Sequence, residues 1–140
     1  MEALLAPYPT AIRDLADGLR GVVERAVPHA AERVRSGWRL IGYEVPDGRR
    51  SRYFAYVAPE MEHVHLGFEY GRWLSDPAEL LHGAHLGLRR VRYLTFRPGD
   101  VIPAEAAIEL TRSAARVALL PRSQRLALEL ERGLGLDAPR

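Results

Sequence analysis

The spacing of apolar residues changes twice along this chain, and that change limits the folds open to it. Between residues 10 and 26 apolar side chains recur every three or four positions, as in an amphipathic helix. Between residues 38 and 96 they alternate with polar side chains, as in half-buried strands. Helical spacing returns between residues 103 and 121. This order predicts an α+β domain in which an antiparallel sheet of about four or more strands packs against N-terminal and C-terminal helices.

Turn-forming residues divide the middle region into separate strands. The expected strands cover residues 38–45, 52–58, 63–68 and 90–96. In the third of them Val64, Leu66 and Phe68 fall on one face, whereas His63 and His65 fall on the other. We expect the apolar face of this strand to lie against the helices.

Two shorter helical segments are also expected. Residues 30–34 are expected to restart the first helix after Pro28, because proline is tolerated in a first helical turn. A second short helix is expected within residues 75–83, with Ser75 or Asp76 as its cap.

The length of 140 residues suits one domain with a C-terminal extension. Residues 1–120 are expected to form the domain, and residues 121–140 a helical extension capped by Ser123. An apolar stripe at helical spacing runs along this extension and consists of Leu126, Leu130 and Leu134. Such a stripe predicts that the extension packs on the domain or on a second copy of the chain, so we expect a homo-oligomer.

The composition excludes several chemistries and partners. The chain has no cysteine, and all 20 of its basic residues are arginine, which excludes disulfides, thiolate metal sites, Schiff bases and the lysine of a P-loop. Few amide and sulfur side chains beside many arginines are typical of a thermophile, and GC-rich codon usage gives the same composition. The formal net charge of +2 predicts no nucleic-acid partner. The sequence has no secretory signal and no apolar stretch of about 18 residues, so we expect a cytoplasmic protein without membrane contact.

An arginine cluster is the strongest candidate for a binding site. Arg89, Arg90 and Arg92 stand close together in a segment without acidic residues. Guanidinium groups bind phosphate and carboxylate through paired hydrogen bonds, so the cluster predicts a small anionic ligand. The alternative is that these arginines pair with acidic residues of neighbouring strands, the candidates being Glu44, Glu62 and Glu69.

A histidine pair is the candidate metal site. His63 and His65 leave the same face of one expected strand, where two imidazoles could share an iron or zinc ion. The alternative is that both belong to the solvated face of a half-buried strand. That alternative requires no metal.

Three segments of the middle region resemble a known family. They are Tyr53-Phe54-Ala55-Tyr56-Val57, His63-Val64-His65-Leu66-Gly67-Phe68 and Gly71-x-x-Leu74-x-Asp76-Pro77-x-x-Leu80-Leu81-x-Gly83. Across residues 8–118 the chain resembles the YdhG-like family, small bacterial proteins with a domain of unknown function. The resemblance implies an antiparallel sheet flanked by two helices. One branch has been proposed to act as frataxin-like iron chaperones, and most members have no assigned activity.

The segment after Gly83 departs from the family pattern. Relatives continue with Thr-Gly-Lys-x-x-Arg-His-Val-Lys, whereas this chain continues Ala84-His85-Leu86-Gly87-Leu88-Arg89-Arg90-Val91-Arg92. Arg89 and Arg92 keep two basic positions, but His85 and Leu86 replace the glycine–lysine pair. If relatives hold an anion with that pair, this chain has lost part of their site.

Three functions are compatible with these features. The first is a cytoplasmic binding module of the YdhG-like class that takes a small anionic ligand or a metal ion. The second is a small enzyme for a phosphorylated or carboxylate substrate, with histidine as general base and arginine as electrostatic stabiliser. The third is a homodimeric interaction protein without a small ligand. Histidine and arginine side chains converging in one cleft would favour the enzyme.

Overall fold

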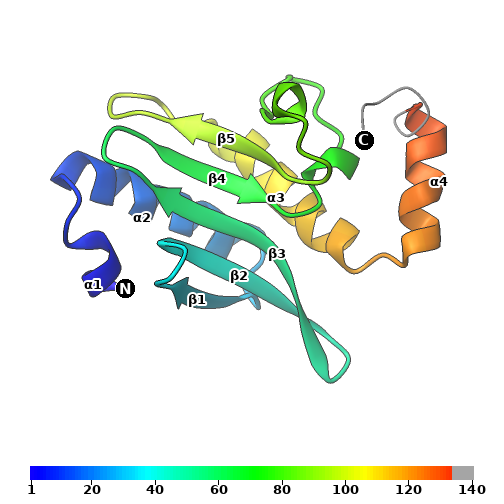
Figure 1. Cartoon of the computed structure of the whole chain (residues 1–140), viewed down its shortest axis with the longest axis horizontal. Coiled ribbons are helices and arrows are strands. Elements are labelled where there is room, and N and C mark those ends of the chain that lie inside the picture. Colours follow the sequence, from blue (N-terminus) through cyan, green and yellow to red (C-terminus); the bar gives the residue numbers. More distant parts are fainter. Residues whose placement is uncertain (134–140) are drawn as a thin grey trace.

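Five antiparallel strands form one sheet in which every strand pairs with its neighbours in the sequence (Figure 1). We describe residues 1–133 of a computed structural model of the chain. The strands are β1 (Ala31–Arg35), β2 (Leu40–Asp47), β3 (Arg50–Pro59), β4 (Val64–Phe68) and β5 (Arg92–Phe96). The helices are α1 (Glu2–Leu5), α2 (Thr10–Ala26), α3 (Ala104–Ala118) and α4 (Arg122–Arg132), with short 3-10 turns η1 (Gly71–Trp73) and η2 (Ala84–Leu86).

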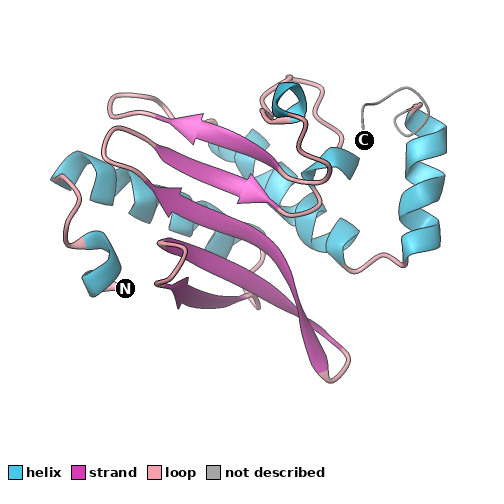
Figure 2. Ribbon diagram, in the orientation of Figure 1, coloured by secondary structure: helices cyan, strands magenta, loops and turns pink. Residues whose placement is uncertain are grey.

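The long helices α2 and α3 lie together on one face of the sheet (Figure 2). Their apolar stripes are buried, and so are Val64, Leu66 and Phe68 of β4, whose side chains are fully inaccessible to solvent. Burying these side chains supplies the main stabilising free energy of the domain. The predicted α+β class, the antiparallel sheet and the flanking helices are confirmed.

The expected helix at residues 30–34 is wrong. The backbone leaves the helical region at Val27, and the following segment becomes β1, which pairs along its length with β2. A tight turn then joins the two strands, with Arg39 in the left-handed region at φ 55°. Pairing with a neighbouring strand supplied backbone hydrogen bonds that a short helix after Pro28 could not match.

The expected helix at residues 75–83 is also wrong. Both carboxylate oxygens of Asp76 accept backbone hydrogen bonds, from the N–H groups of Leu80 and Leu81. Glu79, which directly precedes Leu80, adopts a left-handed conformation with φ 53°, and this conformation interrupts a helix. The aspartate therefore organises a loop, as aspartate side chains do in Asx turns.

Helix α4 packs differently from α2 and α3. It begins directly after Pro121 and has no side-chain cap, so the expected capping role of Ser123 is not observed. It contacts η1, and none of its residues is buried. Leu126 and Leu130 of the apolar stripe are exposed, and Leu134 lies outside the described residues.

The opposite face of the sheet is turned toward the viewer in Figure 1, and no α-helix of residues 1–133 covers it. His65, Tyr56 and Tyr93 lie half-buried on or beside this face, and Gly67 leaves room there for the Tyr56 ring. Within residues 1–133, no helix has both the length and the apolar character that a membrane crossing requires.

Candidate anion-binding site

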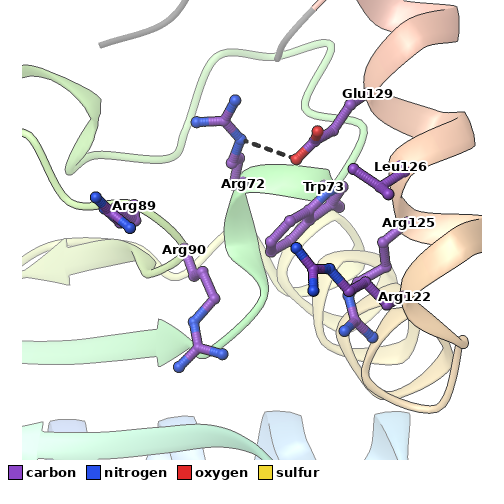
Figure 3. A pocket seen from close by; sticks show the side chains of 8 residues that line it. All are labelled: Arg72, Trp73, Arg89, Arg90, Arg122, Arg125, Leu126 and Glu129. Carbon is purple, nitrogen blue, oxygen red and sulfur yellow. Dashed lines mark ion pairs between the residues drawn. The ribbon is translucent and has the colours of Figure 1, made fainter. Parts of the chain in front are cut away.

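A pocket of about 470 Å³ lies between η1, the segment before β5 and helix α4 (Figure 3). We call it the arginine pocket. It is lined by Arg72, Trp73, Arg89, Arg90, Arg122, Arg125, Leu126 and Glu129. Its volume is within the range of small-molecule sites.

One wall of the pocket is formed by η1 and the segment before β5, and we call it the body wall. It depends on a close approach of these two backbone segments. The N–H of Arg72 donates to the carbonyl of Arg90 over 2.9 Å. A Cβ atom at Gly71 would lie 2.7 Å from the backbone nitrogen of Arg92, so a larger residue at this position would push the segments apart. This contact places Arg89 and Arg90 beside η1.

The other wall, the helix wall, is one face of α4. Arg122, Arg125, Leu126 and Glu129 recur at helical spacing, so their side chains share that face (Figure 3). All four line the pocket.

Three polar contacts join α4 to residues 70–73. The guanidinium of Arg125 lies over two buried rings, 4.8 Å from the ring centre of Tyr70 and 5.7 Å from that of Trp73. Glu129 lies 3.6 Å from the Nε of Arg72, as the dashed line in Figure 3 marks. Arg132 donates to the backbone carbonyl of Trp73. These side chains line or border the pocket, and Leu128 adds apolar packing of the helix against the core.

Positive charge exceeds negative charge in the arginine pocket. Glu129 is the single carboxylate among the described lining residues, against five guanidinium groups. Arg90 also pairs with Glu69 over 2.8 Å, just outside the pocket. The exposed Arg89 and Arg122 form no hydrogen bond or ion pair with any residue in the 1–133 range. Two cations are thus available to a ligand without breaking an existing contact.

The stacked arginines also keep donors for a ligand. A guanidinium has five N–H groups in one plane, so stacking on a ring occupies its face and leaves its edge free to bind. Arg90 lies 5.4 Å from the ring centre of Tyr70 and uses Nη2 for Glu69. Arg125 uses Nη1 for the carbonyl of Leu120. Both retain further N–H groups.

Arg92, the third arginine of the predicted cluster, does not line the pocket. Its Nη1 donates to the carbonyls of Leu88 and Val91, over 2.8 and 2.7 Å. Burial, and then the nearby charge of Arg72, lower the pKa of Arg92. Arg92 therefore stabilises the loop that contains Arg89 and Arg90.

The alternative prediction was that the cluster pairs with acidic residues of neighbouring strands. The structure shows such a pair for one member of the cluster. Arg90 pairs with Glu69. Glu44 instead pairs with Arg33 and Arg35 of β1, near the opposite edge of the sheet. The pocket therefore retains its excess of arginine.

The candidate metal pair lies on the sheet, outside the pocket. The ring centres of His63 and His65 are 4.6 Å apart, and Nδ1 of His65 lies 2.9 Å from Oγ1 of Thr95. Burial, and then the neighbouring His63, lower the pKa of His65. Among the described residues, no group of three or more histidine, cysteine or acidic side chains could hold a metal ion. An iron or zinc site at this pair stays a prediction.

Sequence reasoning missed most of the pocket. Arg72 was not predicted, nor were the α4 residues Arg122, Arg125 and Glu129. Helical spacing of these three was a usable signal for a shared face, but the sequence does not show that this face meets the segment before β5. Trp73 also lines the pocket, where Arg125 lies over its ring.

No family model, curated protein or solved structure matches this chain. The YdhG-like resemblance therefore stays a prediction, and the function is inferred below from the arginine pocket.

Proposed function

We propose that this chain is a cytoplasmic binding module of the YdhG-like class that holds a small anionic ligand in the arginine pocket. One observation carries the proposal: among residues 1–133, five arginines and one carboxylate line the pocket, and the side chains of Arg89 and Arg122 have no partner in that range. Proteins rarely gather like charges without a counter-charge, because the repulsion lowers stability. A bound anion would remove that repulsion.

The pocket supports binding more strongly than catalysis. An enzyme of the expected kind would need a histidine or another titratable base within reach of its substrate. No histidine is among the described lining residues, and His65 instead bonds to Thr95 on the sheet. Arginine stays protonated and is a poor general base. We therefore assign no catalytic residue.

A homodimer is a second candidate, and the exposed apolar residues of α4 favour it. Leu130 is 68% exposed and Leu126 is 47% exposed. Self-association and anion binding are compatible, since a partner copy could cover Leu130 and leave the arginines open. Native mass spectrometry of the purified protein measures the oligomeric state and any co-purified anion or metal in one experiment.

Isothermal titration calorimetry with three anions tests the proposal directly. Orthophosphate, pyrophosphate and citrate are titrated into the wild type, into Arg89→Gln/Arg122→Gln and into the control Arg13→Gln/Arg112→Gln. Both variants lose two exposed positive charges, but the control residues lie on α2 and α3. We expect at least one anion to bind the wild type and the control, and to bind the pocket variant at least about tenfold more weakly. Absence of binding by all three anions, or equal binding by both variants, would overturn the proposal.

A further inference from the structure

The arginines of the pocket stand on two walls that face each other. Arg89 and Arg90 belong to the body wall, and Arg122 and Arg125 belong to α4 (Figure 3). Arg90 and Arg125 lie over the same ring, at 5.4 and 4.8 Å from the centre of Tyr70. Their guanidinium carbons are therefore at most about 10 Å apart. A ligand that carries negative charge at two linked points, no more than about this distance apart, can therefore contact both walls.

The chemistry of guanidinium groups narrows the ligand further. Each binds a phosphoryl or carboxylate group through two parallel hydrogen bonds, so one compact anion satisfies the arginines of one wall. A chain of phosphoryl groups carries several such units in a row. Its length, flexibility and charge suit a pocket with cations on both sides.

We propose that the arginine pocket selects linear oligophosphates, with two or more linked phosphoryl groups, over single phosphates and small carboxylates. This inference rests on the proposed function, because it names the ligand class of the same site. Arg89 and Arg90 bind one end of the chain, and Arg122 and Arg125 bind the other. The apolar side chain of Leu126 borders the same space, so a nucleoside carrying the chain has an apolar surface beside it.

The attachment of α4 makes both walls necessary. No residue of α4 is fully buried, so its position depends on the partly buried Leu128 and on the polar contacts of Arg125, Glu129 and Arg132 with residues 70–73. A ligand that bridges the walls adds to these contacts, whereas a ligand on one wall does not. Bridging therefore predicts that ligand binding slows amide hydrogen exchange in α4.

A chain-length series tests the selection. Orthophosphate, pyrophosphate, tripolyphosphate and acetate are titrated into the full chain by calorimetry at matched ionic strength, because salt screens these interactions. We expect pyrophosphate and tripolyphosphate to bind at least about tenfold more tightly than orthophosphate and acetate. Equal affinity for orthophosphate or acetate would overturn the selection while leaving an anion site in place. Absence of binding by every anion would overturn the proposed function itself.

Single variants of each wall test the bridge. In Arg89→Gln and in Arg122→Gln, pyrophosphate should bind at least about tenfold more weakly, while orthophosphate changes by less than about threefold. The control Arg112→Gln should match the wild type in both titrations. Loss of pyrophosphate affinity in one wall variant alone, or equal losses for both anions, would contradict a bridging ligand. Circular dichroism of each variant shows whether it remains folded.

Two sources of an oligophosphate are separated by one comparison. ATP and tripolyphosphate carry the same chain, but only ATP has a nucleoside. Tighter binding of ATP, together with its loss in Leu126→Ser, would identify a nucleotide as the ligand. Tighter binding of tripolyphosphate would identify the free chain. Failure of both to bind more tightly than orthophosphate would overturn the inference.

Discussion

Two arginine-containing regions of this protein differ in how their charges are balanced. Beside α2, Arg20 bonds to Asp17 over 2.8 Å and to both carboxylate oxygens of Glu32 over 2.9 and 3.1 Å. The hydroxyl of Tyr43, on a side chain that is almost fully buried, donates to the same carboxylate over 2.8 Å. Burial and the bond to Glu32 raise the pKa of Tyr43 well above its usual range. We call this group the Arg20 network.

The arginine pocket has the opposite balance: among residues 1–133, five guanidinium groups and one carboxylate line it, and Glu69 pairs with Arg90 just outside it. The network resembles an internal structural contact, in which each charge has a partner. The pocket resembles a binding site, in which a bound anion would balance the excess positive charge. The same residue type thus indicates stability in one region and binding in the other, and the difference lies in the partners.

The largest expected effect comes from giving the pocket a carboxylate of its own. In Leu126→Glu the new side chain would lie on α4 one turn after Arg122, on the face that lines the pocket, where it would pair with the arginines and repel an anion. We expect pyrophosphate to bind about 100-fold more weakly, with little change in stability. Calorimetry and urea denaturation measure the two quantities. Leu130→Glu, one turn further along and outside the lining, is the control, and a similar loss of binding there would contradict the account.

The next effect comes from separating the segments that build the body wall. The Cβ atom of Gly71→Ala would lie 2.7 Å from the backbone nitrogen of Arg92, a distance that backbone atoms cannot accommodate without moving. We expect the free energy of unfolding to fall by about 1–3 kcal/mol and pyrophosphate binding to weaken. Gly21→Ala on α2 is the control, because its Cβ meets nothing within 4 Å and a helical alanine should stabilise. Wild-type stability of Gly71→Ala would show that the close approach is unimportant.

Removing the acid from the Arg20 network should lower stability and leave binding unchanged. In Glu32→Gln the ion pair with Arg20 is lost and the bond from Tyr43 is weakened. We expect a loss of about 1 kcal/mol in urea denaturation, because both charged side chains are about two-thirds buried. Glu109→Gln breaks exposed pairs with Arg112 and Arg116 and should change stability by less than about 0.5 kcal/mol. Weaker pyrophosphate binding in Glu32→Gln would show that the Arg20 network also contributes to binding, and would contradict the difference drawn between the two regions.

The smallest effect concerns pH and His65. Burial, and then His63, lower the pKa of His65 in the folded state, so the unfolded chain binds the proton more readily. The contribution of a neutral His65 is therefore complete above its unfolded pKa of about 6.5 and is lost as the pH falls toward the lowered folded value. Thermal unfolding between pH 8 and pH 5 should show this loss in the wild type and less of it in His65→Asn. The exposed His85→Asn should behave like the wild type, and an identical pH dependence in all three proteins would contradict the assignment.

The sequence predicted the layers of the fold because periodicity reports which face of an element is buried. The alternation of Val64, Leu66 and Phe68 with histidines located the buried face of β4. Periodicity could not identify β1, whose residues are mostly exposed and whose hydrogen bonds come from β2. A short edge strand of this kind has no apolar face to detect.

The site was harder to predict than the fold because its residues come from three separated segments. The run of Arg89, Arg90 and Arg92 pointed to the right region, but Arg92 binds loop carbonyls instead of lining the pocket. Arg72 and the α4 arginines complete the pocket through tertiary packing, which local spacing does not encode. A predicted arginine cluster therefore gives a location, and the partners of each arginine decide its role.

NMR spectroscopy of the arginine side chains can show which arginines bind the anion. The Nε–Hε resonances of the protein are assigned and followed while pyrophosphate is added, so that every arginine reports in the same titration. We expect saturable shifts for Arg89, Arg90, Arg122 and Arg125, and unchanged signals for Arg20 and Arg112. Shifts that are spread evenly over all arginines, or that are largest at Arg20, would contradict this expectation.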